Sequence, residues 1–72
     1  MPKLPVLAGR DIIAALERLG FEQVRQRGSH VVMRRGSNGT VVPLHKEVKT
    51  GTLAGILRQA ELTQDEFCKA IK

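Results

Sequence analysis

The stretch FEQVRQRGSHVVMRRGSNGTVVPLHK, residues 21–46, gives the strongest indication of the fold. Runs rich in β-branched and alternating residues, bounded by glycine-containing turns, are typical of short strands. Three such runs follow one another here, at about Phe21–Arg27, His30–Arg35 and Thr40–Leu44. Because the turns between them are short, neighbouring strands should pair antiparallel. The stretch therefore predicts a three-stranded antiparallel meander.

Two turn clusters separate these runs. Gly28-Ser29 ends the first run, and Gly36-Ser37-Asn38-Gly39 ends the second. Asn-Gly is the strongest short signal for a hairpin turn, so we expect the four residues Gly36-Ser37-Asn38-Gly39 to form the turn of the second hairpin. Pro43 cannot donate a hydrogen bond to a sheet, so the third strand should lie at an edge or end there.

Helical periodicity flanks the meander on both sides. Ile12, Ile13, Leu16 and Leu19 predict a helix at about Arg10–Leu19, which Gly20 can end in a left-handed conformation. After the meander, the spacing of Leu53, Ile56 and Leu57 predicts a second helix at about Gly51–Gln59, with Thr50 as its N-cap. Thr63 and Glu66 have the spacing of a capping box, which predicts a short third helix at about Gln64–Ile71.

The resulting order is α-β-β-β-α plus a short helix, which is a small α+β fold. The apolar stripes of the helices can cover one face of the sheet and leave the other face open. Pro2 and Pro5 oppose helix, so residues 1–8 are expected to form an extended arm. A chain of 72 residues holds one small domain, residues 1–72.

Composition narrows the class of protein. Twelve Lys and Arg against seven Asp and Glu give a net charge of +5, which favours a polyanionic partner such as nucleic acid, although it also serves solubility. A domain this small buries only about 60% of its unfolded surface, so a protein partner could add much to its stability. With two Phe and no Tyr or Trp, the sequence does not favour single-strand binding by aromatic stacking.

The sequence disfavours a secreted, a membrane-spanning or a metal-binding protein. The lone Cys68 cannot form an internal disulfide, which fits a cytoplasmic location. The N-terminal segment does not look like a signal peptide, and the longest apolar run, Ile12–Leu16, is far too short to cross a bilayer. His30, His45 and Cys68 are too few for a zinc site, so no metal, cofactor or small-molecule ligand is expected.

Half of the basic residues cluster in the meander. Residues two apart on a strand share a face, so Arg25 and Arg27 should point the same way. A basic open sheet face suits contacts to phosphates, which position nucleic acid without reading its sequence. The expected RNA-contacting residues are Arg25, Arg27, Ser29, Arg34, Arg35 and Lys46.

His30 is the candidate catalytic residue. It follows the Gly28-Ser29 turn directly, so its ring can be exposed while a rigid strand holds its backbone. An imidazole is suited to general acid–base catalysis near neutral pH, and the nearby arginines can bring a phosphate to it. On RNA it could activate a 2′-hydroxyl for attack on the adjacent phosphorus. His45 is either a second acid or base or a polar strand end, and the latter is slightly favoured.

These residues also match a known pattern. Leu16-x-x-Leu19-Gly20-Phe21, Gly28-Ser29-His30, Pro43-Leu44-His45 and Gly51-Thr52-Leu53 with Ile56-Leu57 together resemble the HicA family of toxin–antitoxin mRNA interferases. The resemblance covers most of the chain. It implies a fold like that of double-stranded-RNA-binding domains, cleavage of mRNA with His30 as the catalytic residue, and a HicB antitoxin that binds the toxin and blocks the site.

Two alternatives to this enzyme remain open. The same fold could grip RNA by shape and charge without cutting it, with His30 as a phosphate or 2′-hydroxyl ligand. The open sheet face could instead exist to bind a protein partner. The Gly28-Ser29-His30 motif favours the enzyme over the binding module.

Overall fold

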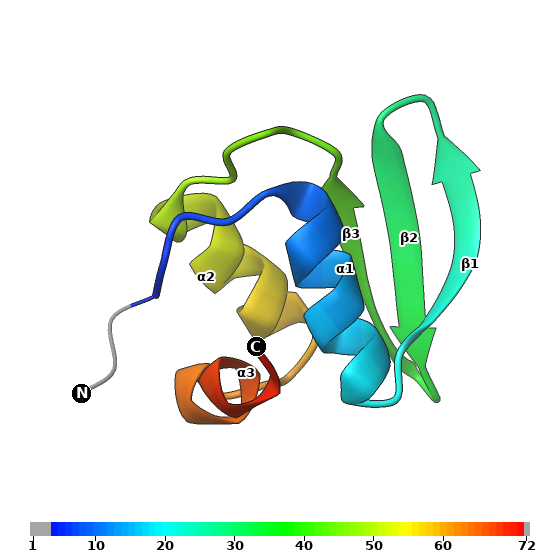
Figure 1. The fold of residues 1–72 in the computed structure, drawn as a ribbon. Helices are drawn as coiled ribbons and strands as arrows, with labels where there is room; N and C mark the ends of the chain where they lie inside the picture. Colours follow the sequence, from blue (N-terminus) through cyan, green and yellow to red (C-terminus); the bar gives the residue numbers. More distant parts are fainter. Residues whose placement is uncertain (1–3, 72) are drawn as a thin grey trace.

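The structure, a computed structural model, describes residues 4–71. Its elements are α1 (Gly9–Arg18), β1 (Glu22–Arg27), β2 (His30–Arg35), β3 (Asn38–Pro43), α2 (Thr50–Gln59) and α3 (Gln64–Ala70). The three strands form one antiparallel sheet in the order β1-β2-β3, and the helices lie on one side of it (Figure 1). The expected α+β fold and its element order are confirmed. Of the expected N-terminal arm, residues 1–3 lie outside the described residues, and residues 4–8 precede α1 without helix.

The helix α1 ends as its sequence predicts. Gly20 adopts a left-handed φ of 96°, and its N–H donates to the carbonyl of Glu17 at 3.0 Å. The N–H of Phe21 reaches back to the carbonyl of Leu16, also at 3.0 Å. This pair of bonds is a Schellman motif, which satisfies carbonyls that the helix itself leaves free. Because Phe21 is then buried in the core, the motif also sets where the chain enters β1.

Two corrections concern the starts and turns of elements. Lys49, not Thr50, is the N-cap of α2, and its side chain makes no capping hydrogen bond. The second hairpin turns at Gly36-Ser37, so Asn38 and Gly39 belong to β3 instead of the turn. Gly36 has a φ of 61°, the left-handed value that a two-residue turn with glycine first requires. The first hairpin uses the same pair of residue types, Gly28-Ser29, with a φ of 54° at Gly28.

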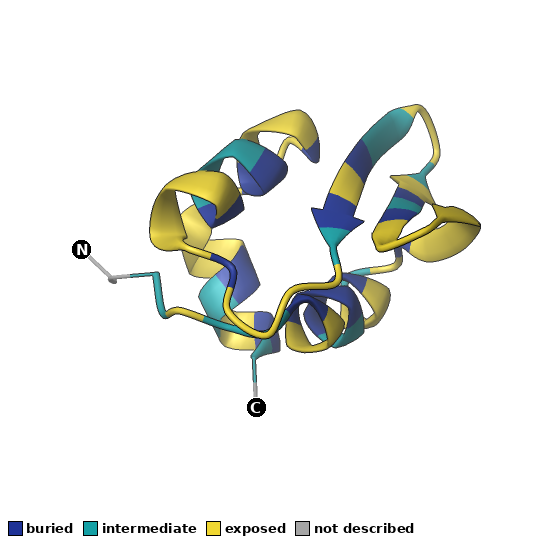
Figure 2. Cartoon of the chain, turned by 90° about the horizontal axis from the view of Figure 1, so that it is seen from above, coloured by how far each residue is buried: buried dark blue, intermediate teal, exposed yellow. Residues whose placement is uncertain are grey.

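The core lies between the helices and the inner face of β2 and β3. Val31 and Met33 of β2 and Val42 of β3 point inward and are almost fully buried, against Ile12, Leu16, Leu53 and Phe67 of the helices. Thr40 is the one buried polar residue in the described chain, and its hydroxyl donates to the side-chain carbonyl of Gln59 at 3.0 Å. Burial therefore alternates along β2 and β3, as a sheet with one covered face requires (Figure 2).

The strand β1 differs from its neighbours. All six of its residues are exposed, because the helices pack over β2 and β3 and leave β1 projecting beyond them. A bulge between Gln23 and Arg25 shifts the pairing with β2 and leaves Val24 about half exposed. The projecting strand and the outer face of β2 and β3 form a continuous surface that no other described part of the chain covers.

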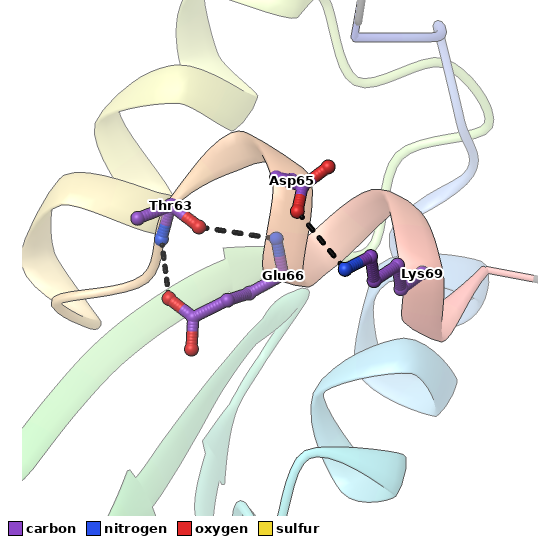
Figure 3. A network of polar contacts seen from close by, with 4 residues as sticks. All are labelled: Thr63, Asp65, Glu66 and Lys69. Carbon is purple, nitrogen blue, oxygen red and sulfur yellow. Dashed lines mark hydrogen bonds and ion pairs between the residues drawn. The ribbon is translucent and has the colours of Figure 1, made fainter.

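The helix α3 begins with the capping box that the sequence predicts. The Thr63 hydroxyl accepts from the N–H of Glu66 at 3.1 Å, and the Glu66 carboxylate accepts from the N–H of Thr63 at 2.9 Å (Figure 3). Lys69 and Asp65 form an exposed ion pair one turn apart at 3.2 Å. Phe67 of this helix is completely buried, and Arg18 of α1 donates to the carbonyl of Ala70 at 2.7 Å. The helix α3 is thus part of the packed domain.

Candidate functional site

His30 is the first residue of β2 and is exposed, as its position after the Gly28-Ser29 turn predicts. The turn is held from both sides. The Gln26 side-chain amide donates to the carbonyl of Gly28 at 3.1 Å, and the N–H of Leu44 donates to the carbonyl of Ser29 at 2.6 Å. A side chain at Gly28 would meet nothing within 4 Å, so glycine is favoured there by its left-handed φ and not by space. The backbone under His30 is therefore well fixed while its ring remains open to solvent.

The arginines beside His30 lie on the outer face of the sheet. Arg27 is directly opposite His30 in the register of β1 and β2, and Arg25 is opposite Val32. Side chains of directly opposed residues share a face and have Cβ atoms about 5 Å apart. Arg34 shares this face as well, with Glu22 opposite it on one side and Gly39 on the other. In the part of the chain that the structure describes, none of these arginines forms an ion pair.

We call this surface the open face and define it by its members. They are Arg25, Arg27, His30, Val32, Arg34 and Val41. It combines three guanidinium groups with two valines, of which Val41 is 42% exposed. Such a surface can bind phosphates through its arginines and apolar groups through its valines.

Arg35, the sixth residue of β2, is placed apart from the other arginines. Its guanidinium donates to the carbonyl of Leu19 at 2.8 Å and lies 4.9 Å from the centre of the Phe21 ring. Since both partners belong to the end of α1 and the entry to β1, Arg35 ties these segments to the end of β2. Its surroundings give it a structural part in the fold.

His45 and Lys46, which the sequence also predicts as site residues, follow β3. They line a pocket to which no residue of the open face contributes. This pocket of about 430 Å³ is lined by Ala8, Arg10, Leu44, His45 and Lys46. His30 does not line it, so the structure does not gather the two histidines in one pocket. Ser29 adjoins His30 and is exposed, with its backbone carbonyl engaged by Leu44.

Sequence reasoning missed Arg10, which it named only as the start of the predicted helix Arg10–Leu19. Its place in the pocket depends on the contact between the start of α1 and the end of β3. Gly9 makes this contact possible, because a Cβ at this position would clash with the carbonyl oxygen of Pro43. The only sign of this contact in the sequence is a glycine just before a helical pattern. That glycine does not indicate which distant residue packs against it.

Two negative findings apply to residues 4–71. No group of three or more His, Cys, Asp or Glu side chains is close enough together to bind a metal ion. No helix in this range has the length and the apolar character needed to cross a membrane.

Together these features define a small α+β domain whose basic open sheet face carries an exposed histidine. Residues 9–62 of the 72 match the family described as HicA toxin of bacterial toxin-antitoxin. The chain therefore belongs to the HicA toxin family, as the resemblance of its motifs indicates, and is the toxin of a toxin–antitoxin system. The match runs from the start of α1 to just beyond the end of α2 and does not include α3. No curated protein matches the sequence.

Proposed function

We propose that this toxin is a metal-independent endoribonuclease that cleaves mRNA in the cytoplasm, with His30 as general acid or base. The single observation that carries the proposal is the pairing of His30 with Arg27 on the open face. An exposed imidazole on a fixed strand start lies beside a guanidinium that can hold a phosphodiester. Arg25 and Arg34 extend the positive charge along the same face, which suits the backbone of a nucleic acid strand.

The proposed reaction uses the nucleophile that RNA carries itself. His30 accepts the proton of a 2′-hydroxyl, and the resulting oxygen forms a bond to the adjacent phosphorus. The bond from phosphorus to the 5′-oxygen of the next nucleotide breaks, and that oxygen takes up a proton. The products are a 2′,3′-cyclic phosphate and a 5′-hydroxyl. Arginines next to the reacting phosphate would stabilise the negative charge that develops on its oxygens.

The test compares wild type with His30→Ala and His30→Gln on one RNA and on a DNA of the same sequence. Gln can still donate and accept hydrogen bonds but cannot exchange protons near neutral pH. We expect both variants to fold and bind RNA, and to lose about 10²–10⁴-fold in cleavage rate. Wild type should cut in EDTA, leave the DNA intact and produce cyclic phosphate ends.

Two results would contradict the proposal. Folded His30→Gln protein that cuts at the wild-type rate would show that His30 is not the proton-transferring group. Wild-type protein that binds RNA in the absence of its partner yet never cuts it would identify the domain as a binding module instead.

The proposal includes inhibition by a HicB-like antitoxin. A partner that covers the open face would block His30 and the arginines together, so a single interface would prevent both binding and cleavage. The apolar exposure of Val41 beside these charged groups gives such a partner surface to bury.

A further inference from the structure

The pocket at the start of α1 has no part in the reaction proposed above. It lies where the segment before α1 passes beside the end of β3 and the loop that follows β3 (Figure 1). Of the five described residues that line it, three carry basic side chains, namely Arg10, His45 and Lys46. Since the pocket lies outside the catalytic pair of His30 and Arg27, its charge requires a separate explanation.

The walls of the pocket are fixed by backbone contacts on both sides. The N–H of Gly9 donates to the carbonyl of His45 at 2.9 Å, and the N–H of Val48 donates to the carbonyl of Leu7 at 2.7 Å. Gly9 also lies directly against Pro43, where no larger residue would fit. The loop after β3 is therefore bonded at two points to the chain that enters α1, which holds the backbones of His45 and Arg10 in place relative to each other.

The chemistry of the lining favours an anion. Within residues 4–71, no carboxylate lines the pocket: Glu47 is not among its lining residues, and Asp11 lines a different cavity together with Arg18. Arg10, His45 and Lys46 make no side-chain hydrogen bond or ion pair with residues 4–71. Three of the first four amides of α1 are already engaged, since Gly9 donates to the carbonyl of His45, and Asp11 and Ile12 both donate to that of Ala8. The affinity for an anion would therefore come mainly from side chains.

The pocket is also linked to the turn that carries His30. The N–H of Leu44, a lining residue, donates to the carbonyl of Ser29, and His30 pairs directly with Pro43 across the sheet. Only Leu44 separates Pro43 from His45 along the chain. His30 and the pocket thus lie at the same end of the molecule, close enough for one nucleic acid strand to contact both.

We propose that Arg10, His45 and Lys46 bind a non-scissile phosphate of the RNA strand that is cut at His30. This inference rests on the proposed function for the identity of the ligand. A phosphate held in this pocket fixes the position of the strand along the protein, so the next phosphodiesters come to lie over Arg27 and His30. His45 is then a positioning residue and not a second acid or base.

The first experiment measures binding without cleavage. The probe is a short 2′-O-methyl RNA, which keeps the phosphate backbone and lacks the nucleophile. A second set of probes carries one neutral methylphosphonate at each position in turn. Arg10→Gln with Lys46→Gln should weaken binding of the unmodified probe about tenfold and reduce the salt slope by about 0.7, the value for one phosphate contact on a single strand. Lys49→Gln is the matched control, because Lys49 lies in the same loop but does not line the pocket.

The decisive readout is coupling between the protein and probe changes. At one methylphosphonate position, the loss seen with wild type should disappear in the Arg10→Gln, Lys46→Gln variant, because both changes remove the same contact. The Lys49→Gln protein should show the full loss at that position. Additive effects at every position would overturn the proposal.

The second experiment separates the pocket from the reaction. With cleavable RNA, His45→Asn should raise KM about fivefold or more and leave kcat close to wild type. A fall in kcat as large as that of His30→Ala would overturn the positioning assignment. If wild type binds the probe with the expected coupling but cuts no RNA, the phosphate pocket stands and the proposed cleavage fails. If it cuts RNA without any coupling, the cleavage stands and the pocket fails.

Discussion

Arg34 and Arg35 are neighbours in the chain and have opposite surroundings. Successive residues of a strand point to opposite faces, so one of the two had to face the helices. Burial of Val31 and Met33 decides which one, because Arg35 shares their side of β2. There its guanidinium donates a hydrogen bond to the backbone carbonyl of Leu19. The alternation of the strand implies that Arg34 and Arg35 point to opposite faces, but which of them points inward is clear only once the inward face of β2 is known.

The opposite surroundings of these arginines predict opposite effects of replacing them. Replacing Arg25 and Arg27 together with Gln should weaken RNA binding and flatten its salt dependence, with little change in stability, because both side chains are exposed and unpaired within the described chain. Replacing Arg35 with Gln should instead lower the free energy of unfolding by about 1 kcal/mol, because a charge-assisted hydrogen bond and a cation–π contact are lost. Urea unfolding and RNA titrations at several salt concentrations measure both effects.

A reversed result would show that these arginines are wrongly assigned. If Arg35→Gln weakened RNA binding as much as the double variant at unchanged stability, the RNA would have to reach the inner side of the sheet. If the double variant retained the affinity and salt slope of wild type, the open face would not carry the phosphate contacts.

Among the elements, the register of β2 and β3 shows that a turn signal does not by itself fix which residues pair across the sheet. Asn38-Gly39 and Gly36-Ser37 are both acceptable two-residue turns by residue type. With Asn38-Gly39 as the turn, Val31 would pair with Lys46. With Gly36-Ser37, it pairs with Val42, and both valines are buried. Cross-strand burial therefore selects Gly36-Ser37, although local propensity favours Asn38-Gly39 as the turn.

The capping box of α3 could be predicted from spacing alone, and it makes stability depend on pH. The backbone and side-chain hydrogen bonds of Thr63 hold the pKa of Glu66 below its ordinary value of 4.5. A carboxyl whose pKa is lowered on folding contributes stability above its unfolded pKa and loses that contribution as the pH falls through the folded value. Wild type should therefore lose stability below about pH 4.5 in part through Glu66.

Glu66→Gln tests this dependence, because Gln at the same position can still accept the hydrogen bond from Thr63 without titrating. Its stability at neutral pH should stay close to wild type, and its loss on acidification should be smaller. Urea unfolding midpoints at pH 7 and at several values below 4.5 measure the difference. Asp65→Asn is the control, since Asp65 is the adjacent acid and has only an exposed ion pair with Lys69. Parallel acid curves for wild type and Glu66→Gln would exclude Glu66 as the source.

At the scale of the whole molecule, local patterns predict the elements, and distant contacts complete the site. The order of elements, the strand β2 with His30 at its start and the open face all follow from periodicity and turn residues. The phosphate pocket does not, because it joins the start of α1 to the end of β3, more than thirty residues apart in the chain. No local signal at Gly9 identifies Pro43 as its neighbour, and Arg10 gains its position only through that contact.

Membership of a toxin–antitoxin family implies that this toxin has an antitoxin as its partner. We expect a HicB-like antitoxin to cover the open face, with acidic groups opposite Arg25 and Arg27 and apolar groups on Val41. Opposite charges across an interface fix its register, and like charges oppose it strongly. Arg27→Glu should therefore weaken the complex by at least about tenfold, whereas Lys69→Glu, an equal charge change at an exposed side chain of α3, should leave it unchanged.

Amide hydrogen exchange of the free toxin and of the complex maps the covered surface independently of any variant. Protection should increase along β1 and at the Gly28-Ser29 turn, because β1 projects beyond the helices and the turn carries His30. The antitoxin should also compete with the 2′-O-methyl RNA probe for the open face, since both require Arg25 and Arg27. Protection confined to α3, or an antitoxin that binds together with the RNA probe, would place the interface away from His30. Inhibition would then have to act on the folding or dynamics of the toxin and not through direct cover of its open face.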